Sequence, residues 1–406
     1  MTAIGGTVPP AALGAGWRTR VTHALCFGVA LGEGFDITSM GVAAPHLGPA
    51  LHLTRAQLGP VFSASILGLF LGALVVGRLA DRFGRKWTLI GSIAVFALFS
   101  AATALAHGFG DLLAIRLAAG LGLGGAFPNM IAMASEVSSE RRRVMLTTIV
   151  AAGMPFGGAL ASLVGASLDW RWIFYLGGGA PALLALAMTA TLSESPAFVL
   201  TRQSAPHARA GFIWTLTGER RLLTTLCLWL ATFCALMALY QLLNWLPILM
   251  GEKGVSKHDA SVVNLVFNLG GGLGVIALAV LMERVSRGFV IVAWYAGLIV
   301  SLVLLALVGP QLLAAGFVAF FAGVFISSAG ILLYGLAPNY YPTAIRATGV
   351  GATVAVGRLG GILGPLVAAA LLTAGAGQAV VLMAMAPLAL IAGGASVALL
   401  TRPSAV

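Results

Sequence analysis

Long apolar stretches separated by short polar segments dominate this chain. A helix that crosses the hydrocarbon core of a bilayer needs about 20 mostly apolar residues. Twelve stretches meet this requirement, near residues 21–47, 57–77, 87–106, 112–134, 145–168, 172–192, 222–249, 260–282, 289–308, 312–336, 347–373 and 377–400. The pattern therefore predicts an all-α integral membrane protein with twelve transmembrane helices in a lipid bilayer.

The two halves of the chain resemble each other at an offset of 203 residues. The polar segment 136–143 after the fourth stretch falls opposite 339–346 after the tenth, and the pair Gly157-Gly158 falls opposite Gly360-Gly361. Repeats with parallel topology are typical of transporters built from two bundles, with the binding site between the halves.

Positively charged residues lie mostly on one side of the predicted bundle. With both termini inside, the inner segments hold 17 of the Lys and Arg residues and the outer segments hold 4. Because Lys and Arg favour the cytoplasmic side, we expect both termini in the cytoplasm. We also expect an N-terminal six-helix bundle over residues 1–192, a cytoplasmic linker over 193–221 and a C-terminal six-helix bundle over 222–406.

Composition excludes soluble proteins, because 59% of the residues are apolar and only 9% are charged, against about 25% charged in a soluble domain. The three cysteines lie in apolar stretches, without the spacing of a disulfide framework or a metal site. Residues 120–125 match the sequence of a dinucleotide-binding pattern, but that pattern must follow a strand. Here the residues lie in a predicted apolar helix. We therefore expect a monomeric non-enzyme without metal, organic cofactor or nucleic acid partner.

Two acidic and two arginine residues lie deep in the apolar stretches, and an ionisable group near mid-bilayer costs about 2.5–3.5 kcal/mol on insertion scales. Glu33 and Asp36 share one face of the first stretch, Arg116 lies in the fourth and Arg358 in the eleventh. A buried carboxyl group can carry a proton, and an arginine can bind a substrate carboxylate. The alternative interpretation is that these residues form static ion bridges.

Two pairs of polar residues lie four residues apart on predicted helices, Tyr240 with Asn244 and Asn264 with Asn268. Either pair is a candidate for binding a ring hydroxyl of a substrate, and Tyr240 for stacking on the ring. Hydrogen bonds between helices explain such residues equally well.

The loop between the second and third stretches resembles the signature of the major facilitator superfamily. It reads Gly77-Arg-Leu-Ala-Asp81-Arg82-Phe-Gly84-Arg85-Lys86. The resemblance implies a gating loop that stabilises the outward-open state, with roles for Gly77, Asp81, Arg82, Gly84 and Arg85. A plain turn held inside by its positive charges is the alternative.

Further motifs are similar to those of the aromatic acid:proton symporters within that superfamily. They are Glu33-Gly-Phe-Asp36, Ser135-Glu136, Asn244-Trp-Leu-Pro247 and the segments 116–129, 341–349 and 356–365. The resemblance implies a bacterial inner-membrane importer that takes up an aromatic carboxylate together with protons. It also implies transport roles for five charged residues: Glu33, Asp36, Arg116, Glu136 and Arg358.

Two details refine this resemblance. Most members begin the first motif with Asp, whereas Glu33 together with Asn244-Trp-Leu-Pro247 resembles the branch that imports 3-(3-hydroxyphenyl)propionate. Benzoate, hydroxybenzoate or gentisate import and, in the same superfamily, proton-driven drug export are the alternatives. For Glu136, a structural pair with the arginines at 141–143 is the alternative to a role in proton coupling.

Overall fold

The computed structural model describes residues 14–138, 143–194, 218, 221–342 and 345–402. In this part of the chain, 12 helical segments are long and apolar enough to cross a membrane, which confirms the predicted fold class. The helices are α1 (Gly14–Ala50), α2 (Arg55–Phe83), α3 (Arg85–Thr103), α4 (Phe109–Gly124), α5 (Ala126–Glu136), α6 (Arg143–Ser167), α7 (Trp170–Thr191), α10 (Leu222–Glu252), α11 (Lys257–Arg284), α12 (Arg287–Leu307), α13 (Leu312–Leu336), η3 (Ala337–Tyr340), α14 (Arg346–Thr373), α15 (Gln378–Met383) and α16 (Met385–Leu400).

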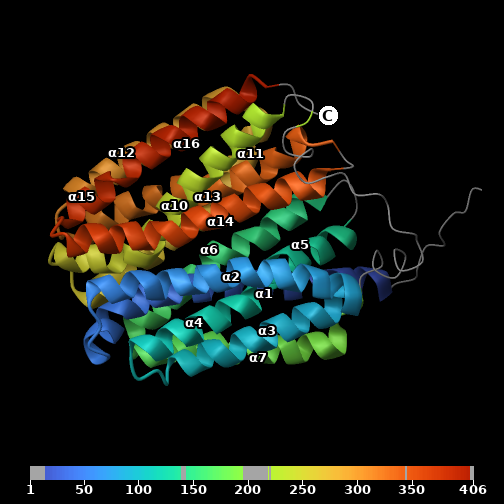
Figure 1. The fold of residues 1–406 in the computed structure, drawn as a ribbon, viewed down its shortest axis with the longest axis horizontal. Coiled ribbons are helices and arrows are strands. Elements are labelled where there is room, and N and C mark those ends of the chain that lie inside the picture. Colours follow the sequence, from blue (N-terminus) through green and yellow to red (C-terminus); the bar gives the residue numbers. More distant parts are fainter. Residues whose placement is uncertain (1–13, 139–142, 195–217, 219–220, 343–344, 403–406) are drawn as a thin grey trace, which may run out of the picture.

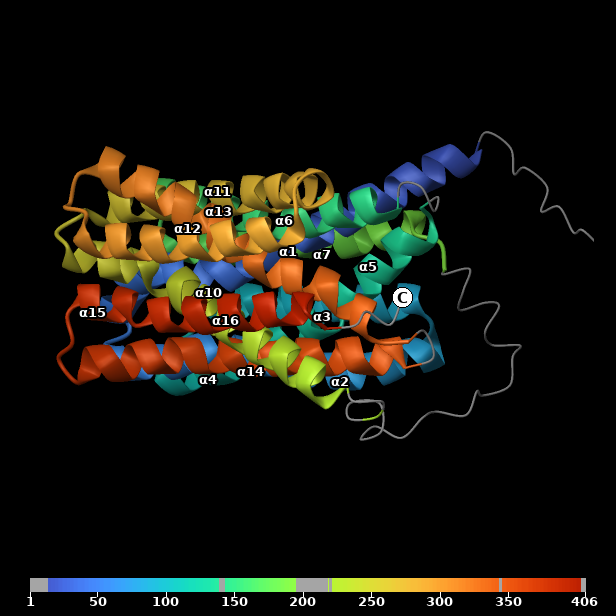
Figure 2. The same ribbon diagram turned by 90° about the horizontal axis from the view of Figure 1, so that it is seen from above.

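The helices run side by side along the long axis of the molecule (Figures 1 and 2). The start of α1 and the end of α16 lie at the same end of the bundle, which we call the terminal end. The opposite end, which carries the α1–α2 and α10–α11 connections, is the far end.

Two of the predicted spans are broken near a proline, which the sequence analysis did not anticipate. The helix α4 ends at Gly124, four residues before Pro128, and α15 ends at Met383, four residues before Pro387. Proline has no N–H group to donate to the carbonyl four residues earlier, so the helix is weakened at that carbonyl. The fourth and twelfth spans therefore each consist of two consecutive helices.

The same helix pairings occur in both halves of the chain. In the first half α1 packs on α6, α2 on α4 and α3 on α7, and in the second half α10 packs on α14, α11 on α13 and α12 on α16. The halves meet where α6 contacts α11, α2 contacts α14 and α1 contacts α10. The domain boundaries themselves remain a prediction, and most of the expected linker over 193–221 lies outside the described residues.

Glycines allow the closest of these helix pairs to approach. A Cβ at Gly120 of α4 would overlap the carbonyl oxygen of Ser65 on α2, and a Cβ at Gly124 would overlap that of Leu69. The glycines of residues 120–125, which match the dinucleotide-binding pattern in sequence, therefore serve a helix–helix contact. Small residues there let the two backbones come close together.

Polar contacts join the two halves near the far end. Arg55 pairs with Glu252 at 2.9 Å, and the Ser63 hydroxyl donates to the Ile362 carbonyl at 2.7 Å. His258 Nδ1 lies 2.9 Å from the Ala166 carbonyl oxygen. Asn264 of α11 also bonds to Ser162 of α6, in the part of the bundle nearer the far end. These contacts close the interface between the halves at the far end.

We expect Gly120→Ala to lower the midpoint of thermal unfolding by about 2 °C or more, because overpacking a tight contact typically costs about 1–3 kcal/mol. Gly179→Ala on α7 is the matched control, since no atom lies within 4 Å of its Cβ position. That variant should unfold at or slightly above the wild-type temperature. Equal midpoints for both variants in detergent would contradict the packing role.

Candidate functional site

A cavity lies between the two halves and is lined by residues of α1, α5, α6, α10, α11, α13 and α14. It contains about 880 Å³ of empty space, including the part that is open to the outside. Most of its wall is apolar. The polar lining residues are Glu33, Thr38, Tyr240, Asn268, Ser327, Tyr334 and Arg358.

The cavity lies on the terminal side of the far-end contacts. At 1.5 Å per residue, Glu33 is roughly 25 Å and Arg358 roughly 22 Å from the far ends of their helices. The lining continues to Ile331 and Tyr334, close to the last residue of α13 at the terminal end. The two charged side chains therefore face the cavity near the middle of the bundle.

Glu33 and Arg358 are both buried, with 2% and 8% of their surface exposed. Glu33 Oε2 and Arg358 Nη1 find no hydrogen-bond partner among the described residues. A buried ionic group without a partner is costly, so such groups normally pair with protein, a proton or a ligand. The cavity thus presents one acidic and one basic group that are available to a bound molecule.

Glycines on either side of Arg358 bring two tyrosines close to it. A Cβ atom added to Gly357 would lie 3.4 Å from Tyr334 Oη. A Cβ atom added to Gly361 would lie 2.7 Å from the Tyr240 ring. Both tyrosines line the cavity. An arginine flanked by aromatic rings suits a ligand that combines a carboxylate with an aromatic ring.

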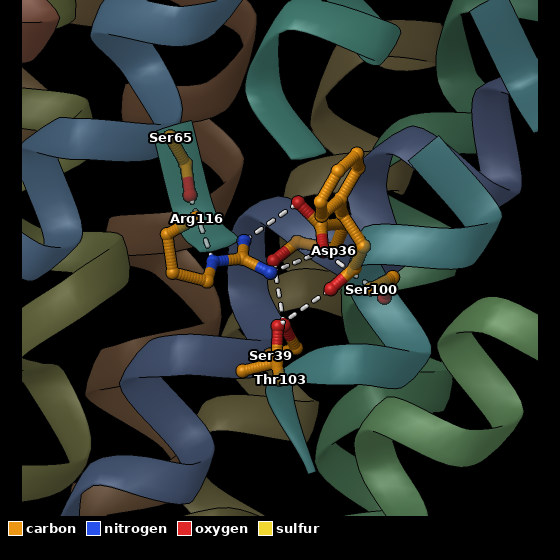
Figure 3. A network of polar contacts seen from close by, with 7 residues as sticks. Asp36, Ser39, Ser65, Ser100, Thr103 and Arg116 are labelled. Carbon is orange, nitrogen blue, oxygen red and sulfur yellow. Dashed lines mark hydrogen bonds and ion pairs between the residues drawn. The ribbon is translucent and has the colours of Figure 1, made fainter. Parts of the chain in front are cut away.

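Asp36 and Arg116, in contrast, are paired with each other (Figure 3). Arg116 Nη1 and Nη2 donate to the two Asp36 carboxylate oxygens at 2.8 and 2.7 Å, and each side chain is only 1% exposed. Arg116 Nε donates to Ser65 Oγ at 2.8 Å, and Ser100 Oγ lies 3.5 Å from Asp36 Oδ1. This bidentate pair links α1 to α4 inside the first half of the chain.

The remaining predicted polar residues lie in three different places. Tyr240 and Asn268 line the main cavity. Asn244 donates from Nδ2 to the Tyr240 carbonyl at 2.8 Å and lines a smaller cavity beside Asp36 and Arg116. Asn264 donates from Nδ2 to Ser162 Oγ at 3.0 Å, across the interface between the halves.

Sequence reasoning missed several hydroxyl groups that complete these sites, namely Thr38, Ser65, Ser100 and Ser327. Their helices contain many small polar residues, and only the packing shows which of them reach a cavity or a charged group.

A sequence model of the Major Facilitator Superfamily matches residues 26–365 and 228–406. The chain belongs to this superfamily. The chain is 43% identical over 394 residues to the 3-(3-hydroxy-phenyl)propionate transporter of Escherichia coli (strain K12), with 96% of each chain covered. It is 36% identical to the gallate transporter of Pseudomonas putida, covering 87% of this chain and 85% of the relative. These relatives are membrane transporters and not enzymes.

A solved transporter structure shares the fold. It is the crystal structure of a bacterial homologue of the human lysosomal transporter Spinster, in an inward-facing and unoccupied conformation. The TM-score is 0.73 at 18% identity, and the alignment covers 97% of this chain and 98% of the other. At this identity the similarity supports the fold alone.

The superfamily's signature loop joins α2 to α3 through Gly84, whose φ of 92° is accessible mainly to glycine. Arg85 forms an ion pair with Glu136 at the end of α5. The Glu194 carboxylate accepts the backbone N–H groups of Arg85 and Lys86 at 2.9 and 3.0 Å, at the positive end of the α3 dipole. Sequence reasoning did not identify Glu194.

The surroundings of Gly77 and Asp81 lie outside the described part, as do the arginines at 141 and 142. Arg82 is exposed, with its guanidinium 5.2 Å from the Phe83 ring centre.

We expect Asp36→Asn alone to lower the thermal midpoint clearly, because it leaves Arg116 as an uncompensated buried charge, at a cost of about 3–5 kcal/mol. The double variant Asp36→Asn with Arg116→Gln removes both charges and should recover at least half of that loss. Thermal unfolding in detergent of the wild type, both single variants and the double variant completes the cycle. Strictly additive losses would contradict the pairing.

Proposed function

We propose that this protein is a proton-coupled importer of 3-(3-hydroxyphenyl)propionate or a related hydroxylated aromatic acid. The observation that carries the proposal is the buried Arg358 guanidinium with an unpaired Nη1 at a cavity between the halves. Two relatives whose names specify 3-(3-hydroxy-phenyl)propionate and gallate support an aromatic acid as the substrate.

Arg358 binds the substrate carboxylate in this proposal. A guanidinium presents a planar fork of N–H donors that matches both oxygens of a carboxylate. The ring then lies against Tyr240, Tyr334 and the apolar wall of the cavity. Arg116 plays a different part, because its guanidinium already holds Asp36 in two hydrogen bonds.

Glu33 carries the coupling proton, and the charge balance explains the coupling. In the empty cavity the charges of Arg358 and ionised Glu33 cancel. A bound anion alone adds one buried negative charge, whereas a bound anion together with a protonated Glu33 again gives zero. Because net buried charge is costly in the membrane, the empty and the fully loaded forms are the ones that interconvert between inward- and outward-open states.

Several further features belong to the same proposal. The protein works as a monomer in the bacterial inner membrane, with both termini in the cytoplasm and protons as the only coupling ion. The far-end contacts then form the external gate. The Arg85–Glu136 pair and the signature loop stabilise the gate on the terminal side. Asp36 and Arg116 hold α1 and α4 together while the halves move.

Import of another aromatic acid is the second candidate, favoured by the similarity to the gallate transporter. Export of a cationic drug fits less well, because a buried arginine in the cavity repels a cation.

We expect liposomes containing the protein to accumulate 3-(3-hydroxyphenyl)propionate when the outside is at pH 6 and the inside at pH 8. A protonophore should abolish the accumulation. The acid is ionised at both values, given carboxylate pKa values near 4, so leakage of neutral substrate does not explain the effect.

Glu33→Gln is the matched variant for this assay. It should lose accumulation but keep exchange of labelled for unlabelled substrate, because exchange needs no net proton movement. Accumulation that is insensitive to the protonophore would contradict proton coupling. Normal accumulation by Glu33→Gln would contradict the role of Glu33, and uptake of benzoate or gentisate alone would contradict the substrate.

A further inference from the structure

We infer that Thr38, Asn268 and Ser327 form a second polar subsite in the cavity, which accepts a hydrogen bond from a ring hydroxyl of the substrate. This inference rests on the proposed function, since it assigns a specificity to the same aromatic acid site. It goes beyond that function in predicting that the protein selects phenolic acids over otherwise identical acids without a free hydroxyl.

The orientation of the Asn268 amide is fixed by its neighbour. Asn268 Nδ2 donates to the backbone carbonyl of Asn264 at 2.8 Å. A carbonyl oxygen only accepts, so the amide nitrogen must point to it and Oδ1 must point away. Oδ1 faces α6, where a Cβ at Gly158 would overlap it. The bond to Asn264 uses only Nδ2, so Oδ1 can still accept a hydrogen bond, and Asn268 lines the cavity.

Two hydroxyl groups complete the subsite. A Cβ atom added to Gly158 would lie 2.6 Å from Thr38 Oγ1. A Cβ atom added to Gly271 would lie 2.6 Å from Ser327 Oγ. Both residues line the cavity, and neither hydroxyl has a hydrogen-bond partner in the described part of the chain. Thr38 is buried and Ser327 is half-buried. Because polar groups inside a protein are normally hydrogen-bonded, these hydroxyls are suited to a polar group of a ligand.

Asn268 and Thr38 lie at a different depth from Arg358, whereas Ser327, like Arg358, lies roughly 22 Å from the far end of its helix. Counted from the far ends of their helices, Asn268 is roughly 16 Å deep and Thr38 roughly 18 Å, whereas Arg358 is roughly 22 Å deep. The axial offset of about 6 Å separates the anchor for the carboxylate from the acceptor for the hydroxyl. An aromatic acid with a short spacer can therefore place its ring between the two.

The two asparagines of α11 consequently have different roles. Asn264 is bonded to Ser162 across the interface and is not among the residues that line the cavity. Asn268 lies one turn closer to the terminal end and faces the cavity.

An unpaired acceptor discriminates by chemistry as well as by shape. A phenol donates its O–H to Asn268 Oδ1, whereas a methoxy group has no hydrogen to donate and an unsubstituted ring leaves the acceptor unpaired. Sites that are built to bond a substrate hydroxyl reject analogues that lack it more strongly than apolar pockets reject a missing methylene.

The test is isothermal titration calorimetry on the full-length protein in detergent with three ligands: 3-(3-hydroxyphenyl)propionate, 3-phenylpropionate and 3-(3-methoxyphenyl)propionate. The wild type should bind the hydroxylated acid about tenfold or more tightly than either analogue. In Asn268→Ala and Thr38→Val this preference should fall to within about twofold to threefold, with the affinity for 3-phenylpropionate nearly unchanged.

Asn129→Ala is the matched control, because Asn129 on α5 is also buried and donates from Nδ2 to the carbonyl four residues earlier, at 2.8 Å, but does not line the cavity. It should keep the wild-type preference. Equal loss of affinity for all three ligands in the variants would show a structural role and overturn the subsite.

A wild type that binds the three acids equally would overturn the subsite and leave the proposed function standing. A folded wild type that binds none of them would overturn both proposals.

Discussion

The structure depends on one constraint, namely that a charged group inside a membrane protein must find a partner. Two acidic and two basic side chains lie deep inside the bundle, and the fold treats them in two ways. Asp36 and Arg116 satisfy each other in a bidentate pair that is sealed from solvent. Glu33 and Arg358 each keep an unpaired polar atom at a cavity. The first pair stabilises a bundle, and the second requires a proton and a ligand.

The helix packing produces this difference. Glycines such as Gly120 and Gly124 bring α4 against α2, so that Arg116 is enclosed beside α1 and its guanidinium reaches Asp36. Gly357 and Gly361 bring tyrosines beside Arg358 on α14, at the interface between the halves. The far-end contacts close one side of that interface. A site at a movable interface suits alternating access, because movement of the halves exposes it in turn to the two sides.

Most of the fold could be predicted from the sequence, because length and hydropathy decide where a helix spans a membrane. The breaks before Pro128 and Pro387 were missed, and proline alone does not mark them, since α6, α7 and α10 each continue through a proline. The roles of the two arginines could not be separated, since each is a single cation in an apolar stretch. Only the packing shows that Arg116 has a carboxylate within reach and that Arg358 Nη1 does not. The same holds for Asn264 and Asn268, which share a helix and a spacing of four residues.

The central claim is that Arg358, and not Arg116, binds the substrate carboxylate. The most direct measurement compares the affinities for 3-(3-hydroxyphenyl)propionate and its uncharged amide, in the wild type and in Arg358→Gln. The account predicts that the wild type prefers the acid by about tenfold or more, since bonds to charged groups contribute about 1.5–3 kcal/mol, and that Arg358→Gln binds both compounds equally and weakly. A folded Arg358→Gln protein that keeps the preference for the acid would contradict the account.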